Sequence, residues 1–353
     1  MRKLTRKIYV GDVAIGGDSP ISIQSMTTYQ TSDIDKVVDQ INALENLGCD
    51  ISRSAINTVE DAKAISQIKK RTNIPFVADI QFDYKLALLA VENGCDALRI
   101  NPGNIGSKDK VIEVVNKCKE KNIPIRIGVN SGSVHKSMIE KYHGVNVDSL
   151  VYSAIEEVKT LEELDFFDII ISVKSSDVNT MIDSYRKLSS LVDYPLHLGV
   201  TEAGPLYTAL VKSSIGLGSL LKDGIGDTIR VSITGDPLEE IKAGKAILKA
   251  LGLRRDGIDL ISCPTCSRTT VDLPKIAQEV ERKIAGINKN LKVAIMGCPV
   301  NGPGEAKEAD YGIACAKGYG FLFKKGKTIR KVDEDKIVDE LIGTIMKDCS
   351  DEN

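Results

Sequence analysis

The chain repeats one pattern, in which a short β-rich run is followed by an amphipathic helical stretch. Two copies are similar even in sequence: A-L-E-N-L-G-C-D-I-S-R at 43–53 and A-V-E-N-G-C-D-A-L-R-I at 90–100. Each combines a helix end, a glycine that suits left-handed geometry, and a strand with an arginine. The pattern predicts strands near 21–26, 51–55, 74–79, 97–101, 124–129, 168–173, 196–200 and 227–231, and helices near 33–47, 58–71, 83–93, 108–122, 148–163, 178–191, 204–222 and 237–251.

Eight strand–helix units in roughly 250 residues predict a TIM (β/α)8 barrel. Residues 6–15 are expected to form a hairpin that closes the barrel's bottom, and H-K-S-M-I-E-K-Y-H-G an inserted loop after the fifth strand. Further strands near 258–261, 291–296, 311–315 and 320–331, with helices near 274–284 and 334–347, predict a smaller α/β domain. The expected organisation is therefore a barrel over 1–253 and a second domain over 257–353.

Composition narrows the class of protein. Forty-seven basic and forty-nine acidic residues leave a net charge of −2, which gives no general bias towards nucleic acid or membrane. We find no signal-like apolar core near the basic N-terminus and no run of 18 apolar residues. We therefore expect a soluble, cytoplasmic protein. Eight cysteines fit a reducing compartment, where thiols act as ligands or as small core residues.

Charged and polar residues gather where the predicted barrel strands end. Since TIM-barrel chemistry lies at the C-terminal ends of the strands, this set is the candidate site. Its five cations outnumber its two carboxylates, and a buried ring with such a surplus is costly without an anionic partner. Arginine favours planar, bidentate recognition of phosphate, so four arginines suggest a ligand with two phosphoryl groups. The residues are Arg53, Asp79, Arg99, Asn101, Arg126, Asn130, Lys174, Glu202, Arg230 and Ser232.

A second candidate site is the cysteine-bearing stretch from 261 to 305. It holds Cys263 and Cys266 in C-P-T-C, and Cys298 in a G-C-P-V-N-G-P-G-E turn that ends at Glu305. Three thiolates from two loops suit zinc, copper(I) or an iron–sulfur cluster. The spacing matches neither common ferredoxin pattern, and a structural four-cysteine zinc site completed by Cys315 stays open.

These motifs resemble the 4-hydroxy-3-methylbut-2-enyl diphosphate synthase family of the methylerythritol phosphate isoprenoid pathway. The resemblance rests on C-P-T-C-S-R-T and M-G-C-P-V-N-G-P-G-E, and extends upstream through V-A-D-I-x-F-D-Y-K-L-A, I-N-P-G-N-I-G, V-T-E-A-G and S-S-I-G-L-G. It implies an iron–sulfur oxidoreductase that opens and dehydroxylates 2-C-methyl-D-erythritol 2,4-cyclodiphosphate, with flavodoxin or ferredoxin as electron donor. It also implies a [4Fe-4S] cluster on Cys263, Cys266, Cys298 and Glu305.

The resemblance assigns roles to the strand-end residues as well. It implies that Arg53, Arg99, Asn101, Arg126, Asn130, Lys174, Arg230 and Ser232 bind the substrate, and we expect Asp79, Glu202 and Glu305 to act in catalysis. One position departs from the family, because Gln81 stands where a histidine is usual. An amide cannot deliver a proton near neutral pH, so any acid at this position must be absent or replaced. Among the three histidines, His197 is the nearest substitute, whereas His135 and His143 are expected to be structural or exposed.

The predicted geometry also favours a head-to-tail homodimer. The eighth helix, about 15 residues long, ends about 22 Å from the barrel's top. The connector G-L-R-R-D-G spans at most about 20 Å, so the second domain cannot easily cap its own barrel and is expected to cap a neighbour's. Two other hypotheses stay open: a zinc-stapled phosphosugar lyase or isomerase, and nucleic-acid binding by the K-K-G-K-T-I-R-K run at 324–331.

Overall fold

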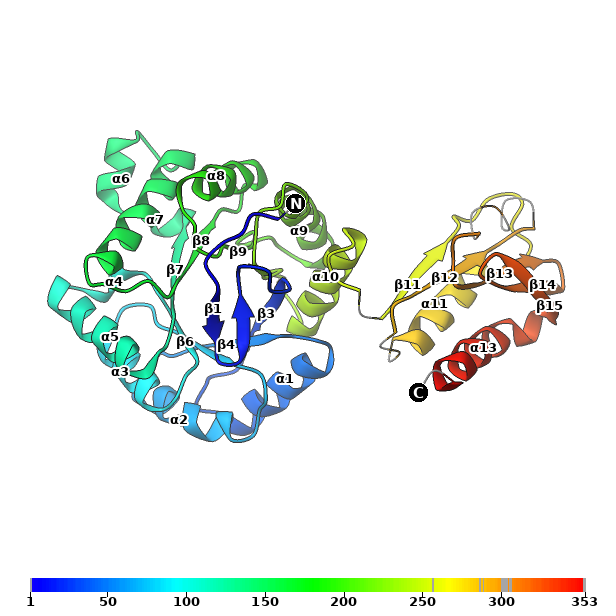
Figure 1. Ribbon diagram of the computed structural model, residues 1–353, viewed down its shortest axis with the longest axis horizontal. Coiled ribbons are helices and arrows are strands. Elements are labelled where there is room, and N and C mark those ends of the chain that lie inside the picture. Colours follow the sequence, from blue (N-terminus) through cyan, green and yellow to red (C-terminus); the bar gives the residue numbers. More distant parts are fainter. Residues whose placement is uncertain are drawn as a thin grey trace. The chain divides into compact units, whose positions relative to one another are not determined.

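The computed structural model describes the whole chain except residues 1, 256, 286, 288, 300–303, 305, 306, 352 and 353. By its internal contacts the chain divides into two compact units, Met1–Arg254 and Arg255–Asn353. Figure 1 labels the elements of both units. Within the described residues, no helix combines the length and hydrophobicity needed to cross a membrane.

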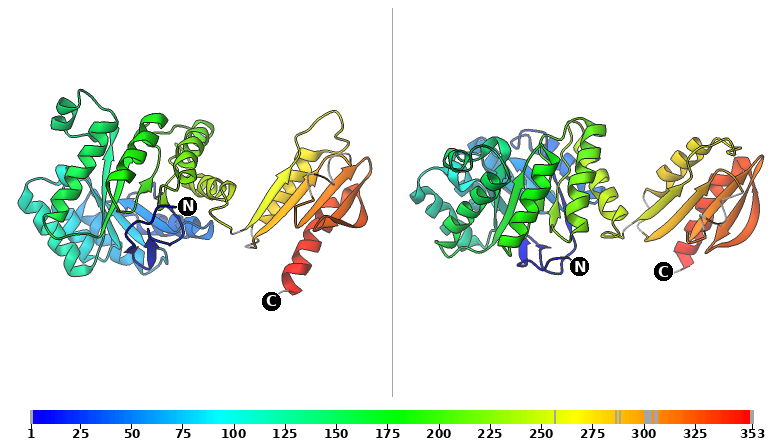
Figure 2. Two further views of the ribbon diagram at one scale, coloured as in Figure 1. Left: turned by 45° about the horizontal axis from the view of Figure 1, so that its top comes forward. Right: turned by 90° about the horizontal axis from the view of Figure 1, so that it is seen from above.

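The first unit is a parallel barrel surrounded by helices, as Figures 1 and 2 show. Its strands follow the order β8-β7-β6-β5-β4-β3-β10-β9, and a bridge between Ile171 and Leu196 links β8 to the segment before β9. The prediction of a TIM barrel is confirmed. The strands are β3 (Ser22–Met26), β4 (Ile51–Ala55), β5 (Phe76–Asp79), β6 (Ala97–Ile100), β7 (Ile125–Asn130), β8 (Ile169–Lys174), β9 (His197–Leu198) and β10 (Thr228–Ile229).

Each strand is followed by a helix that packs outside the barrel. Several begin at side-chain caps that the sequence supplies: Thr58 forms a capping box with Asp61, and Asn146 and Asp177 accept hydrogen bonds from the first turns of α7 and α8. The helices are α1 (Ile34–Asn46), α2 (Val59–Lys69), α3 (Tyr84–Glu92), α5 (Lys108–Lys121), α7 (Val147–Glu162), α8 (Val178–Leu191), α9 (Leu206–Lys222) and α10 (Pro237–Ala250). Short helices α4 (Pro102–Ile105), η1 (Ser131–Ser133) and α6 (Lys136–Lys141) lie in loops after β6 and β7.

A hairpin closes the N-terminal end of the barrel. Its strands are β1 (Ile8–Val10) and β2 (Val13–Ile15), which pair around Gly11 at φ 58°. Their apolar side chains pack against residues that point down from the barrel strands, including Ile51, Val77, Ala97 and Ile170. The hairpin therefore seals one end, and a ligand site is left to the other.

The second unit is a five-stranded mixed sheet with two helices on one face. The strands follow the order β11-β12-β13-β14-β15, with the first three parallel and the last two antiparallel. Buried apolar side chains from sheet and helices form its core. The elements are β11 (Ile258–Ser262), α11 (Leu273–Ile284), β12 (Leu291–Met296), β13 (Tyr311–Ala316), β14 (Tyr319–Lys324), β15 (Lys327–Asp333), η2 (Glu334–Lys336) and α13 (Ile337–Asp351).

Candidate active site

A polar pocket of about 230 Å³ lies at the C-terminal ends of the barrel strands. Eight of the ten strand-end residues named from the sequence line it, together with Gln81 and two residues that the sequence reasoning missed, Ser172 and Thr201. Parallel strands end on the same side of a barrel, so residues far apart in the chain meet there. The full lining is Arg53, Asp79, Gln81, Arg99, Arg126, Asn130, Ser172, Lys174, Thr201, Arg230 and Ser232.

Asp79 holds two of the pocket's arginines. Its carboxylate lies 3.1 Å from Arg99 Nη1 and 3.5 Å from Arg53 Nε. Burial alone would raise the pKa of Asp79, but the adjacent guanidinium groups outweigh that effect and lower its pKa below the ordinary value. Asp79 is therefore ionised at neutral pH, which suits it to orient the arginines rather than to supply a proton.

Gln81 joins the same network through both ends of its amide. Its Nε2 donates to Asp79 Oδ1 at 3.2 Å, and its Oε1 accepts from Arg99 Nη1 at 3.3 Å. An amide can donate and accept at once without changing charge. The residue that departs from the family's histidine thus bridges a carboxylate and a guanidinium.

Glu240 is a site residue that the sequence reasoning missed. It accepts from Arg230 Nη2 at 3.0 Å and from Arg230 Nε at 3.1 Å, in a bidentate pair. Ser25 Oγ and the Ile233 N–H also donate to it. Glu240 lies in the first turn of α10 rather than at a strand end, so a search confined to strand ends could not find it. Its spacing of ten residues from Arg230 carried no signal.

Arg126 and Lys174 have no carboxylate partner among the described residues. Arg126 donates to Gln24 Oε1, while its buried Nε and Nη2 find no hydrogen-bond acceptor in the described part of the chain. Burial lowers the pKa of both groups well below their ordinary values, and the neighbouring cations lower it further. The pocket thus places five cations beside two carboxylates, Asp79 and Glu240, and keeps a surplus of three positive charges.

Two glycines make room for these long side chains. A side chain at Gly128 would begin 2.5 Å from Arg99 Nε, and one at Gly199 would begin 2.7 Å from Lys174 Nζ. Atoms do not approach that closely, so any other residue would displace the cation. The two glycines therefore help to fix the positions of the Arg99 and Lys174 side chains in the pocket.

Two predicted site residues do not line the pocket. Asn101 is the N-cap of α4, where its Oδ1 accepts from the Gly103 N–H at 3.2 Å. Glu202 is exposed and has a left-handed backbone with φ 51°. Their roles in substrate binding and catalysis stay predictions.

His197 lies in the barrel interior and is absent from the described lining of the pocket. It is fully buried, and burial together with nearby cations lowers its pKa well below the ordinary value. The ring is neutral at pH 7 and does not compensate for the missing histidine at position 81. His135 hydrogen-bonds Ser137, and His143 occupies a left-handed turn at φ 56°.

In the second unit, two of the predicted cysteine ligands lie at one edge of the sheet. Cys263 directly follows β11 and Cys298 follows β12, its parallel neighbour. The Gly297 N–H donates to Cys263 Sγ at 3.1 Å. Cys266 is exposed in a turn with Thr269, and the backbone N–H of Arg268 lowers the pKa of its thiol. Thiolates that accept backbone N–H bonds are typical ligands of iron–sulfur clusters.

The donor chemistry fits a cluster, although the described side chains do not form a complete metal site. Among the described residues, no group of three or more histidine, cysteine, aspartate or glutamate side chains is close enough together to hold a metal ion. Glu305, the predicted fourth ligand, lies outside the described residues. Cys315 is fully buried in β13, and burial raises the pKa of its thiol to about 12, as expected for a core cysteine.

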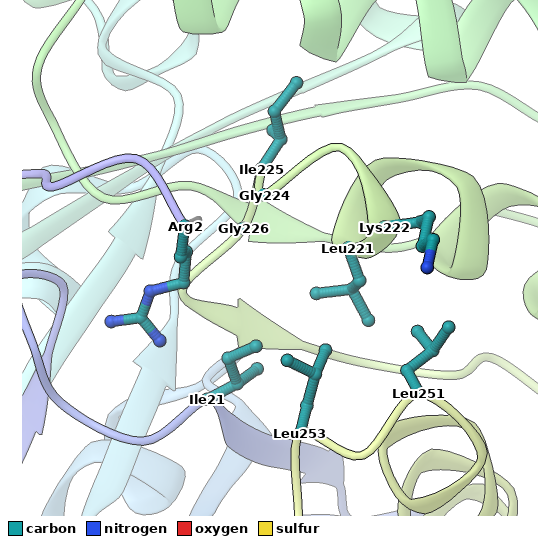
Figure 3. A pocket seen from close by; sticks show the side chains of 9 residues that line it. All are labelled: Arg2, Ile21, Leu221, Lys222, Gly224, Ile225, Gly226, Leu251 and Leu253. Atoms are coloured by element: carbon teal, nitrogen blue, oxygen red, sulfur yellow. The ribbon is translucent and has the colours of Figure 1, made fainter.

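A second cavity, of about 240 Å³, lies at the barrel's N-terminal end (Figure 3). Leucine and isoleucine side chains point into it, with Arg2 and Lys222 as the only charged groups among the described lining residues. It brings together the start of the chain, the end of α9 and the segment after α10. In TIM barrels this face usually contributes stability rather than chemistry.

A cationic barrel site, together with three cysteines in the loops of the second unit, fits a barrel oxidoreductase with an iron–sulfur domain. Residues 5–245 match the family model described as the GcpE TIM-barrel domain, and residues 259–347 match the GcpE protein C-terminal domain. The chain belongs to the GcpE family.

Relatives of the same length carry one enzyme name, 4-hydroxy-3-methylbut-2-en-1-yl diphosphate synthase (flavodoxin). The protein of that name from Clostridium tetani is 60% identical, over 98% of this chain and 99% of its own. The protein of that name from Fusobacterium nucleatum is 56% identical, over 99% of this chain and 98% of its own.

Solved structures share the barrel fold alone. Dihydropteroate synthase from Xanthomonas albilineans with 7,8-dihydropteroate superposes with a TM-score of 0.50 at 11% identity, covering 70% of this chain and 98% of that one. Wild-type HPPK-DHPS from Plasmodium falciparum with STZ-DHP superposes with a TM-score of 0.51 at 14% identity. The match covers 70% of this chain and 50% of that one.

Proposed function

We propose that the barrel's cationic pocket binds 2-C-methyl-D-erythritol 2,4-cyclodiphosphate, and that the chain reduces it to (E)-4-hydroxy-3-methylbut-2-enyl diphosphate. The reaction is a reductive ring opening and dehydroxylation in isoprenoid biosynthesis by the methylerythritol phosphate pathway. The observation that carries the proposal is a buried surplus of three positive charges at the barrel's top, in a chain 60% identical to a named synthase.

The chain's own residues bind and orient the diphosphate. Arg126 and Lys174 are the two cations without a carboxylate partner among the described residues, so they gain most from phosphoryl oxygens. Arg53, Arg99 and Arg230 are already held by Asp79 and Glu240, and they offer donors in fixed directions. Such preorganised charge orients the substrate and stabilises charge that develops as the ring opens.

A [4Fe-4S] cluster held by Cys263, Cys266, Cys298 and Glu305 would supply single electrons and an iron site for a substrate oxygen. A carboxylate is a harder and more exchangeable ligand than a thiolate, which suits Glu305 to yield its place to the substrate. Flavodoxin is the proposed electron donor, with ferredoxin as the alternative, because the relatives' names specify flavodoxin. We expect Glu202 to bind a substrate hydroxyl or proton.

The test is an anaerobic turnover assay with the purified, reconstituted protein. Cyclic diphosphate and reduced flavodoxin should yield the linear hydroxybutenyl diphosphate by mass spectrometry, in a brown protein that contains iron and sulfide. A colourless protein that holds zinc and converts a phosphosugar would support the zinc-stapled lyase instead.

We further propose that the working unit is a head-to-tail homodimer, in which each barrel is served by the second domain of its neighbour. The connector at 252–257 spans at most about 20 Å, too short to lead easily around the barrel's helices from its bottom to its top.

Mixing two inactive variants tests this arrangement. Arg126→Ala disables the barrel and Cys298→Ser the cluster domain, so a mixed dimer contains one intact site and should recover activity. Verified heterodimers that stay inactive while both domains remain folded would contradict sharing.

A further inference from the structure

A third, much smaller cavity lies in the barrel interior, between the cationic pocket and the N-terminal hairpin. Its volume is about 10 Å³, and Val10 and Ile15 of the hairpin form part of its wall. Arg126 lines this cavity and also lines the cationic pocket, so one residue borders both spaces. The polar side chains on the wall are those of Gln24, Arg126, His197 and Thr228.

Two of these polar side chains have hydrogen-bonding groups without a partner. Nε and Nη2 of Arg126 and Nε2 of His197 are buried, and they hydrogen-bond no residue in the part of the chain that the structure describes. Arg126 is 4% exposed and His197 0%. Burying a polar group without a partner is costly, most of all for a charged group, so such groups usually have one. Two of them on the wall of one cavity indicate a shared polar partner inside it.

The size of the cavity restricts that partner to a water molecule. A buried water needs a cavity of at least roughly 10–15 Å³ and two to four polar partners. This cavity is at the lower limit, so it has room for one water and for nothing larger. Cavities that stay empty are lined by apolar groups, whereas this one has four polar side chains on its wall.

The donors and acceptors on the wall fix the direction of the hydrogen bonds. Arginine can only donate, so an Arg126 N–H donates to the water oxygen, and the water must donate to an acceptor. His197 Nε2 accepts when the ring proton is on Nδ1, which lies 3.4 Å from Thr228 Oγ1. Burial and the cations of the pocket hold the pKa of His197 well below its ordinary value, so the ring is neutral and Nε2 is free to accept.

We propose that this cavity holds one ordered water, which accepts a hydrogen bond from Arg126 and donates one to His197 Nε2, and that His197 thereby positions Arg126 for the diphosphate. Gln24 Oε1 holds a second side of the guanidinium group by accepting from Nη1. The remaining N–H groups of Arg126 are then left for phosphoryl oxygens. His197 acts through the water and through Arg126, and is therefore a positioning residue. The inference rests on the proposed function and deepens it.

A high-resolution crystal structure of the holoprotein without substrate tests the water directly. We expect an electron-density peak in the cavity within about 3.2 Å of both an Arg126 nitrogen and His197 Nε2. An empty cavity, or a peak that reaches only one of the two side chains, would overturn the proposal. Because this measurement involves no substrate, its result does not depend on the proposed function.

Substitutions at position 197 test the positioning role. His197→Leu removes the acceptor, and it should weaken binding of the cyclic diphosphate about tenfold, because a buried charged group loses a hydrogen bond. The turnover rate at saturating substrate should change little, since the bound diphosphate itself holds Arg126. His197→Gln places an amide oxygen near the position of Nε2 and should bind nearly as tightly as the wild-type protein. Calorimetry measures affinity, and steady-state kinetics separate KM from kcat.

Two further variants keep the result decisive. His197→Asn has a shorter amide that can reach Thr228 but not the cavity, so it should bind as weakly as the leucine variant even if that variant folds poorly. Ser22→Ala is the control. Ser22 Oγ is buried and hydrogen-bonds no described residue, but Ser22 is absent from the described lining of the cavity, so this variant should bind like the wild-type protein.

Unchanged affinity in the leucine and asparagine variants would overturn the positioning role. A glutamine variant that binds no better than these two would also overturn it, because the acceptor would then be irrelevant. A wild-type protein that contains the water but does not bind the cyclic diphosphate would instead refute the proposed function and leave the water bridge standing.

Discussion

The barrel top and the cysteine loops hold the side chains of their candidate sites in different ways. In the barrel, Asp79 and Glu240 form ion pairs with three arginines, and Asp79, Arg53 and Arg99 project from strands. In the second unit, Cys263 and Cys298 lie just past strand ends and Cys266 lies in an exposed turn. Charges of one sign must be held apart by the fold, whereas thiolates are drawn together by the metal that they bind. Substitutions in the two sites should therefore have separate effects, on substrate binding in the barrel and on metal content in the second unit.

Cys298→Ser should abolish the cluster and reduce turnover by at least about 1,000-fold, because a serine oxygen is a poor ligand for iron–sulfur centres. Visible absorption and iron analysis measure the loss. The barrel should still bind the cyclic diphosphate, since its pocket shares no described residue with the cysteine loops. Cys315→Ser is the matched control, and it should keep the cluster; loss of all cluster iron in that variant would make Cys315 a ligand.

Arg126→Ala should weaken substrate binding by about 100-fold or more, as expected when a buried, charge-assisted phosphate contact is removed. Cluster absorption should not change. Binding is measured by calorimetry with the cyclic diphosphate, and Lys36→Ala, which removes an exposed lysine of α1, is the control. Cluster loss with unchanged affinity would place the diphosphate site elsewhere.

Glu305→Ala should leave a three-cysteine cluster that assembles and turns over about 10–100-fold more slowly, because water replaces an exchangeable carboxylate. Iron content and steady-state rate, measured side by side, separate assembly from turnover. Full activity in this variant would show that Glu305 is not the exchangeable ligand.

Lys174→Met should raise the melting temperature of the substrate-free protein by a few degrees and weaken diphosphate binding. Burial lowers the pKa of Lys174 in the fold, so the cost of charging it is fully present below that lowered pKa and disappears as the pH rises towards 10.5. The wild-type protein should therefore gain stability relative to the variant as the pH rises through this range. Differential scanning calorimetry of both proteins from pH 7 to pH 10 measures this difference in stability. If the melting temperatures of the two proteins change with pH in the same way, the charged form of Lys174 does not destabilise the fold.

Short sequence patterns predicted the barrel, its N-terminal hairpin and most of the residues that line the pocket. The repeated strand–helix pattern predicts the barrel, and the structure also contains the hairpin predicted over residues 6–15. Asp79, Arg99, Lys174 and Arg230 were found because parallel strands end together. Arg126 lines the same pocket from the second residue of β7, so its position along the strand did not predict its place there. Cys315, which the sequence left open as the fourth ligand of a zinc site, is fully buried in the core of the second unit.

Other features depended on tertiary structure. Glu240 pairs with Arg230 only because α10 packs back against the barrel, and Asn101 turns to cap α4 rather than to line the pocket. Gln81 bridges Asp79 and Arg99, a role that its residue type alone does not reveal. The fold class, the family and the local excess of positive charge followed from the sequence, because they depend on short-range patterns and on the residues placed at strand ends. Which of these cations form ion pairs depends on the packing of the folded chain, because an ion pair requires residues far apart in the sequence to come within a few ångströms.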